Sequence, residues 1–128
     1  MLLSKNAILK TDDRVQEEVE VPEWGGHVIV RSISGAERDN FEKGLSDDKG
    51  KVNISNIRAK LCAITMVDAD RKPLFSGTSD VVALGNKSAA ALDRVFTVAK
   101  RLNGLLETDI KEIVKNSEAT RADDSTSS

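Results

Sequence analysis

The chain has 128 residues, enough for one domain, and its 19 basic and 21 acidic side chains leave a net charge of −2. This balance argues against binding of nucleic acid or an anionic membrane by bulk charge. Three phenylalanines, one tryptophan and no tyrosine leave few rings to stack on unpaired bases. The single cysteine, Cys62, excludes an internal disulfide and a cysteine-based zinc site. Because no apolar run approaches the ~20 residues of a membrane span and no signal peptide is recognisable, we expect a cytosolic protein.

The first half of the chain predicts a β-hairpin followed by two helices. Residues 1–10 are partly apolar and Ser4 is a good helix cap, but two isolated turns are marginal, which leaves their state open. Alternating apolar residues predict strands over 15–21 and 28–33, joined by a glycine-containing loop. The capping-box spacing of Ser34 and Glu37 predicts a helix from Gly35 to Leu45. A second helix is predicted from Asn53, with an apolar stripe formed by Ile54, Ile57, Leu61 and Ile64.

The second half predicts three more helices and a disordered end. After a break at 68–73 and an apolar plug or short extended piece at 74–75, Thr78 and Ser79 predict a helix that stops at Gly85. Asn86 or Ser88 caps the next helix, whose core-facing residues are Leu92, Val95, Phe96, Ala99 and Leu102. A last helix is predicted from residue 108, and residues 117–128 are expected to be disordered.

These elements predict an α+β fold. Residues 1–116 form a single domain in which an N-terminal β-hairpin packs on a bundle of four to five α-helices. Residues 117–128 form a disordered acidic tail, which by itself carries the whole net charge of −2.

Charge is unevenly distributed along this predicted domain. Residues 12–23 carry six acids against one arginine, a net charge of −5, whereas residues 87–101 carry four bases against one acid, a net charge of +3. The acidic hairpin and the basic helix either meet across a subunit contact or remain two solvated faces. Arg94 and Arg101 of the basic helix are therefore candidate interaction residues.

The sequence predicts no catalytic, cofactor-binding or metal-binding residues. It lacks the common phosphate-binding, dinucleotide-binding, nucleophile-elbow and zinc-protease motifs. His27, the only histidine, is expected on the surface of a strand, and Cys62 is expected to be a buried, inert thiol. Two acidic loops, at 68–73 and 46–51, place the wrong residue types at the ligand positions of a calcium loop. Glycosylation triplets at 53–55 and 86–88 are interpreted as helix starts.

Trp24 is the most informative single residue, because it is the only tryptophan and lies at the predicted hairpin tip after Pro22. Tryptophan in such a loop is a favoured interface anchor. The alternative is that the ring folds back onto the helices as a lid on the core, since a large apolar ring rarely stays fully exposed. Trp24 and Pro22 join the two arginines as candidate interaction residues.

Five segments, in this order, resemble the tail assembly chaperones of long, flexible-tailed bacteriophages and their prophages. They are residues 18–26 (EVEVPEWGG), 34–42 (SGAERDNFE), 67–68 with 72–75 (VD, KPLF), 84–85 with 87–93 (LG, KSAAALD), and 101–105 (RLNGL). The resemblance covers residues 4–116 and rests on the order of the segments, since none of them alone is chemically diagnostic.

The resemblance implies a non-enzymatic protein of the host cytoplasm that self-associates, coats the tape-measure protein and recruits major tail-tube subunits. Such a chaperone is not expected in the mature virion. The alternatives are a structural tail-completion or head–tail connector protein, a host-directed regulator or nucleic-acid binder, and a small enzyme that joins His27 to an acid or to Cys62.

The resemblance also implies a longer form of the chain, made by a −1 translational frameshift near its end. The tripeptide Val114–Lys115–Asn116 can be encoded by a heptamer on which two tRNAs re-pair one base back. We therefore place the expected shift at Lys115–Asn116, which makes residues 117–128 the expendable end of the unshifted product. A Lys115 codon of AAG would exclude this site.

Overall fold

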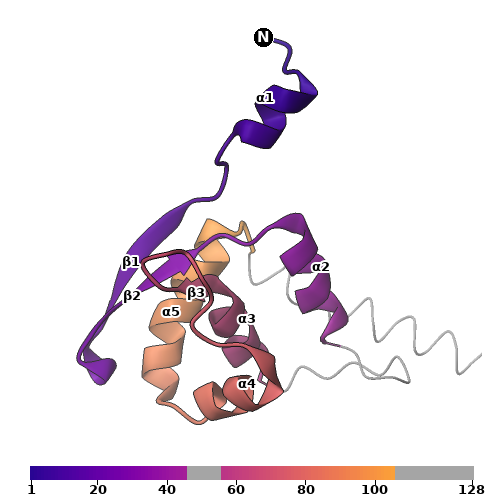
Figure 1. Ribbon diagram of the computed structural model, residues 1–128. Helices are drawn as coiled ribbons and strands as arrows, with labels where there is room; N and C mark the ends of the chain where they lie inside the picture. The colour runs from indigo at the N-terminus through magenta and orange to yellow at the C-terminus, as the bar shows by residue number, and fades with distance from the viewer. Residues whose placement is uncertain (46–55, 106–128) are drawn as a thin grey trace, which may run out of the picture.

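The computed structural model describes residues 1–45 and 56–105, and over these residues it confirms the predicted α+β class. A three-stranded antiparallel sheet packs on helices (Figure 1). Several predictions fall outside the described residues. They are the acidic loop at 46–51, the helix start and triplet at 53–55 with Ile54 of the stripe, the helix from residue 108, the frameshift position and the disordered tail.

The predicted hairpin is present as β1 (Gln16–Val21) and β2 (Gly26–Arg31). The two strands pair so that Val19 lies opposite Val28 and Val21 opposite Gly26. Side chains alternate between the two faces of a strand, so Val19 and Val21 lie on the buried face while Glu18 and Glu20 are exposed. The hairpin thus presents an apolar face to the helices and an acidic face outward.

A third strand, β3 (Met66–Val67), was not predicted. It pairs antiparallel with β2, placing Met66 opposite Val30 and Val67 opposite Ile29. The chain reaches it through α2 (Gly35–Lys43) and α3 (Ile57–Thr65). The pattern predicted helix up to residue 64, and a strand of two residues is too short to show any periodicity of its own.

The predicted capping box at the start of α2 is confirmed. The Ser34 hydroxyl accepts a hydrogen bond from the Glu37 amide at 3.1 Å, and the Glu37 carboxylate accepts one from the Ser34 amide at 2.8 Å. Each residue therefore satisfies a backbone donor that the first turn of a helix leaves free.

The helices α4 (Gly77–Gly85) and α5 (Ala89–Leu102) complete the described domain. Thr78 and Ser79 were predicted to cap α4, but the helix begins earlier, with Ser76 as its N-cap. The Ser76 amide donates to the Asp80 carboxylate at 2.9 Å. The glycine at 77 permits this, because its φ of 81° is strained for other residues. Ser88, one of the two predicted caps of α5, accepts from the Ala91 amide.

The core lies where the inner face of the hairpin meets α3 and α5. All the predicted core residues of α5 are buried except Leu102, which is partly exposed. The described residues of the predicted α3 stripe, Ile57, Leu61 and Ile64, all pack on the core. The helix also buries a wider face than the stripe, because it packs against both α4 and α5. Its buried residues are Ala59, Leu61, Cys62, Ala63 and Thr65.

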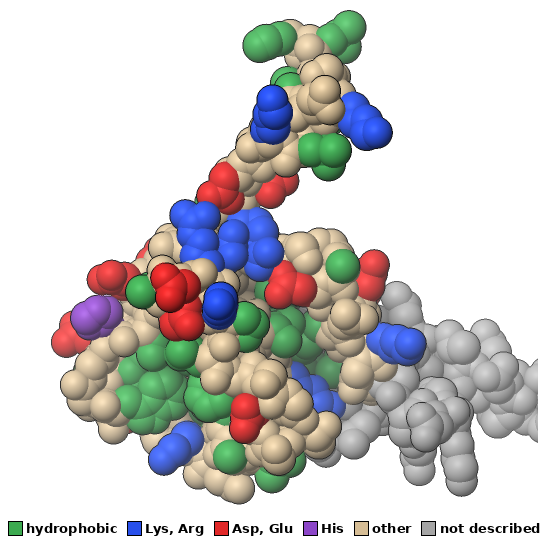
Figure 2. Space-filling view, viewed as in Figure 1, with side chains coloured by type: hydrophobic (Ala, Val, Ile, Leu, Met, Phe, Trp, Pro, Cys, Tyr) green, Lys and Arg blue, Asp and Glu red, His purple; other side chains and the backbone are tan. Residues whose placement is uncertain are grey.

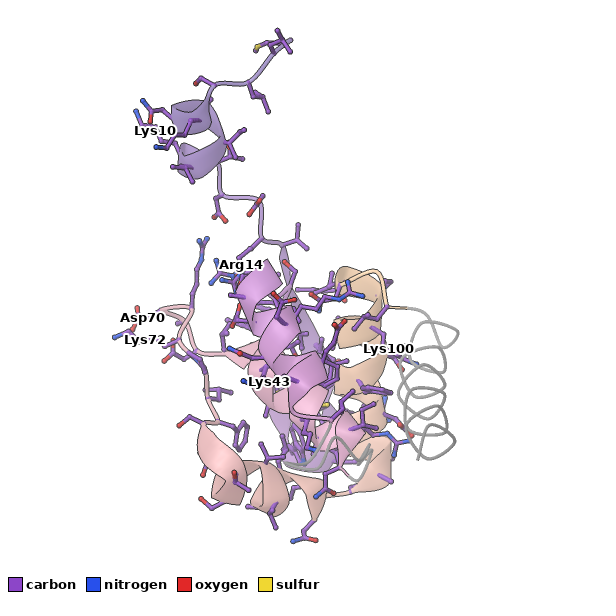
Figure 3. The ribbon with its side chains drawn as sticks, turned by 90° about the vertical axis from the view of Figure 1, so that its right-hand side faces the viewer. Lys10, Arg14, Lys43, Asp70, Lys72 and Lys100 are labelled. Carbon is purple, nitrogen blue, oxygen red and sulfur yellow. The ribbon has the colours of Figure 1, made fainter. Side chains whose placement is uncertain are left out.

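Residues 1–11 form an arm that stands away from this body (Figures 1 and 3). The arm contains α1 (Lys5–Lys10), in which no residue is buried. Its N-cap, Ser4, accepts from the Ala7 amide at 3.1 Å, and Thr11 donates from its hydroxyl to the Ala7 carbonyl at 2.8 Å. The arm is joined to the body at Arg14, which donates to the Ser32 carbonyl at 3.1 Å.

Candidate functional site

The hairpin tip holds Trp24 against the body. The turn is a short 3₁₀ helix, η1 (Pro22–Trp24), in which proline begins the helix and the Gly25 amide donates to the Pro22 carbonyl at 3.0 Å. Gly25 follows with a φ of 74°, a conformation that favours glycine. This turn directs the indole back toward the helices, where it packs against the core while staying partly exposed. Of the two alternatives for Trp24, the ring folded back on the core is the one observed, while its role as an interface anchor stays a prediction.

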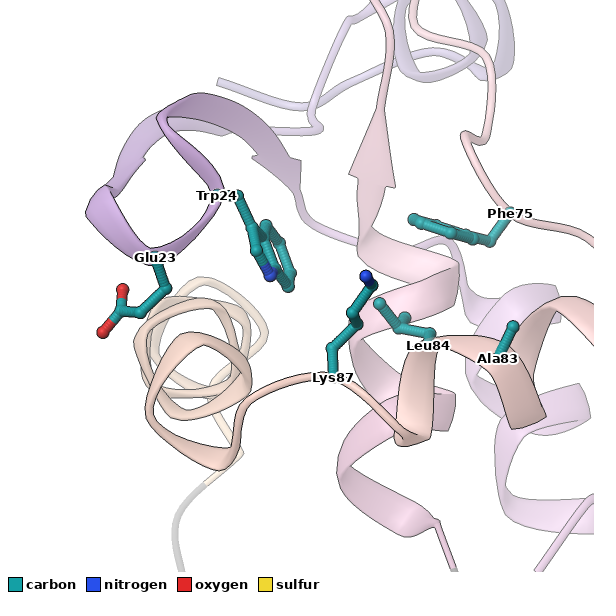
Figure 4. A pocket seen from close by; sticks show the side chains of 6 residues that line it. All are labelled: Glu23, Trp24, Phe75, Ala83, Leu84 and Lys87. Carbon is teal, nitrogen blue, oxygen red and sulfur yellow. The ribbon is translucent and has the colours of Figure 1, made fainter.

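The exposed side of the indole forms one wall of a hollow of about 470 Å³, which we call the tip hollow (Figure 4). Phe75 lies across from Trp24, and α4 contributes the floor. The lining is largely apolar, with one acid and one base: Glu23, Trp24, Phe75, Ala83, Leu84 and Lys87. Hydrophobic side chains gather on this face of the body (Figure 2). The hollow therefore offers apolar surface to a partner.

The acidic hairpin and the basic helix meet within one chain. Arg94 of α5 lies 2.9 Å from the Glu23 carboxylate, and Arg101 lies 2.6 Å from that of Glu17. The hydrogen bond from Arg94 lowers the pKa of Glu23 below its usual value. The sequence analysis considered a contact between subunits or two separate solvated faces. The structure shows a third arrangement, in which the acidic hairpin and the basic helix contact each other within one chain. The charge asymmetry therefore no longer supports a subunit contact, and both arginines brace the hairpin against α5.

A second hollow of about 510 Å³, which we call the helix groove, lies between α2, α3 and α4. Phe41, Ile64 and Val81 supply its apolar part, one from each helix. Polar groups surround them, from Glu37, Asn40, Gly44, Lys60, Gly77 and Thr78. No local pattern in the sequence reveals this groove, because its lining comes from segments up to 44 residues apart (37–81).

The arm carries the most exposed apolar side chains of the described chain. Leu2, Leu3, Ile8 and Leu9 have exposed fractions of 100%, 63%, 55% and 72%. Their apolar character was visible in the sequence, but only the structure shows that nothing in the described body covers them. The arm, the tip hollow and the helix groove are the three candidate interaction surfaces.

The structure also places the other residues that the sequence singled out. His27 is exposed on β2, 3.8 Å from Glu18. Cys62 is fully buried, and burial raises the pKa of its thiol to about 12, which confirms the prediction of an inert group. In the acidic turn, Asp68 accepts from the amides of Asp70 and Lys72 and so closes the loop. Among the described residues, no cluster of three or more His, Cys, Asp or Glu side chains is arranged to hold a metal ion.

Comparison with known protein families, characterised proteins and solved structures gives no match for this chain. Over residues 1–45 and 56–105, no helix has both the length and the apolar character that crossing a bilayer requires.

Proposed function

We propose that this protein is a phage tail assembly chaperone that self-associates, coats a tape-measure protein and recruits tail-tube subunits without catalysing a reaction. The observation that carries the proposal is the amount of apolar surface that the described residues of this small domain leave uncovered. An exposed aliphatic arm and two apolar hollows are typical of a protein that works through contacts with other proteins. The sequence resemblance over residues 4–116 supplies the identity of those partners.

The helix groove is the surface we assign to the tape-measure protein. Such a protein is long and helical, with apolar faces that aggregate unless they are covered. A groove with an apolar centre and polar margins accepts the apolar face of an amphipathic helix. Each groove is small, so one contact is weak, and affinity arises when many copies bind along the same helix. Weak single contacts also allow tail-tube subunits to displace the chaperone.

Co-production with the tape-measure protein tests the proposal. We expect that protein to stay soluble and to co-purify with this chain, and we expect the chain to be absent from purified phage particles. Recovery of stoichiometric amounts from mature particles would instead favour a tail-completion or connector subunit. Tape-measure protein that stays insoluble with or without this chain would contradict the proposal.

Two neighbouring positions on α4 make the test specific to the groove. Thr78 is exposed and lines the groove, so Thr78→Glu adds a carboxylate near Glu37 and places charge where an apolar helix face would bind. Val82 is 49% exposed and lines neither hollow, which makes Val82→Glu the matched control. We expect the first variant to lose tape-measure binding by about tenfold, a difference of about 1.4 kcal/mol, and the second to keep it.

A further inference from the structure

The arm and the tip hollow are two unpartnered apolar surfaces at opposite ends of the hairpin. The arm joins the body just before β1, whereas the hollow lies at the tip that follows β1 (Figures 1 and 4). Six strand residues at about 3.3 Å each separate these ends by roughly 20 Å. A contact between the two surfaces would remove from water the most exposed aliphatic side chains of the described chain.

Ile8 and Leu9 of a chain cannot reach the hollow of the same chain. Its base is held by two ion pairs, between Asp12 and Arg71 at 2.9 Å and between Arg14 and Glu37 at 2.7 Å. Leu9 and Ile8 are three and four residues from Asp12, spans of at most about 11 and 14 Å even when fully extended. The hollow lies beyond the far end of β1, roughly 20 Å away, so these two side chains can only occupy the hollow of another molecule.

The arm is basic, and two carboxylates lie beside the tip hollow, on the outer face of the hairpin. The hollow itself is lined by Lys87 and by Glu23, which pairs with Arg94. The arm carries Lys5 and Lys10 and no acid before residue 12, a net charge of +2 from its side chains. The outer face of the hairpin carries Glu18 and Glu20, which line a shallow cleft of about 300 Å³ beside the tip, together with Gly26 and His27. An arm with its leucines in the tip hollow brings its lysines to the same end of the hairpin as these carboxylates.

We propose that the arm of one copy docks in the tip hollow of a second copy, with Ile8 and Leu9 against Trp24 and Phe75. The arm and the tip hollow lie at opposite ends of the hairpin. Each copy can therefore bind one neighbour through its arm and a second neighbour through its tip hollow. Such a heterologous contact extends into an open chain or closes into a ring, depending on its rotation. The inference takes one element from the proposed function, which is that copies of the chain associate with each other.

Cross-linking between full-length copies tests the contact directly. A Leu9→Cys variant is mixed with an Ala83→Cys variant under mild oxidation, because Ala83 is exposed and lines the hollow. Cys62 does not interfere, since it is buried and its thiol stays protonated. We expect a disulfide-linked dimer containing one copy of each variant. Val82→Cys, one residue away and outside the hollow, is the control and should give little of this dimer.

Trp24 gives a second readout, because it is the only tryptophan. A peptide of residues 1–12 added to the full chain should shift its emission to shorter wavelength as the indole loses water. Ala83→Lys should abolish the shift, whereas Val82→Lys should leave it. In sedimentation, Leu9→Glu should weaken self-association by about tenfold or more, as expected for loss of one buried aliphatic side chain.

Three outcomes would overturn the proposal. The first is a pair of cysteine variants that forms no mixed dimer. The second is a Leu9→Cys, Ala83→Cys double variant that links only within one chain. The third is a Leu9→Glu variant that associates as strongly as the original chain. In this last case the copies associate through another surface. The proposed chaperone function would be unaffected, because it is tested separately by tape-measure binding.

Discussion

Replacing Trp24 by alanine measures how far the hairpin tip is fastened to the core. A tryptophan buries roughly 200 Å² when it is fully enclosed. Trp24 is partly exposed and packs against the core on one side, so the loss is roughly 100–150 Å² of apolar area. At about 25 cal/mol/Å² this amounts to about 3 kcal/mol, and a compact unfolded state reduces the expected cost of Trp24→Ala to about 2 kcal/mol.

Urea denaturation followed by far-ultraviolet circular dichroism is the appropriate assay, since the variant lacks the fluorescent ring. Trp24→Phe is the control, because it keeps an aromatic ring at the same position, and we expect it to cost less than about 1 kcal/mol. A change below about 0.5 kcal/mol for Trp24→Ala would show that the ring contributes no packing energy. The account of the tip as a lid on the core would then be wrong.

Three further predictions concern groups away from the tip. Asn103 accepts from the Ile33 amide and donates to the Ala99 carbonyl, both at 2.8 Å, so Asn103→Ala should lower the free energy of unfolding by about 1–3 kcal/mol. Thr97 is exposed on the same helix, so Thr97→Ala should leave the free energy of unfolding nearly unchanged. Cys62 has a folded pKa of about 12, above its ordinary value of 9.0, so its unfolded thiol ionises first and stability should fall between about pH 9 and 12. If the stability of a Cys62→Ala variant falls equally steeply over this pH range, ionisation of Cys62 is not the cause. Arg94→Ala, which removes an exposed ion pair, should leave the free energy of unfolding nearly unchanged and leave self-association unchanged in sedimentation.

Local chemistry in the sequence was sufficient to predict most helices and the hairpin. The Ser34–Glu37 capping box is complete within four residues, so its outcome does not depend on the rest of the fold. The alternation in β1 and β2 likewise predicts which side chains face inward, because the period of a strand is two residues. The burial of Cys62 followed from its apolar neighbours along the helix. These features share one property, which is that the interacting groups lie close together in the chain.

The tertiary structure decided everything that depends on distant segments. Met66 and Val67 became a strand because β2 offers them a free edge, which no local pattern reveals. Glu23 and Arg94 are 71 residues apart, and only the packing of the hairpin on α5 converts two opposite charge clusters into an intramolecular ion pair. The same packing turns Trp24 into a wall of the tip hollow and leaves the arm without a partner among residues 1–45 and 56–105. Sequence determines which surfaces are apolar, but only folding shows which of them stay uncovered.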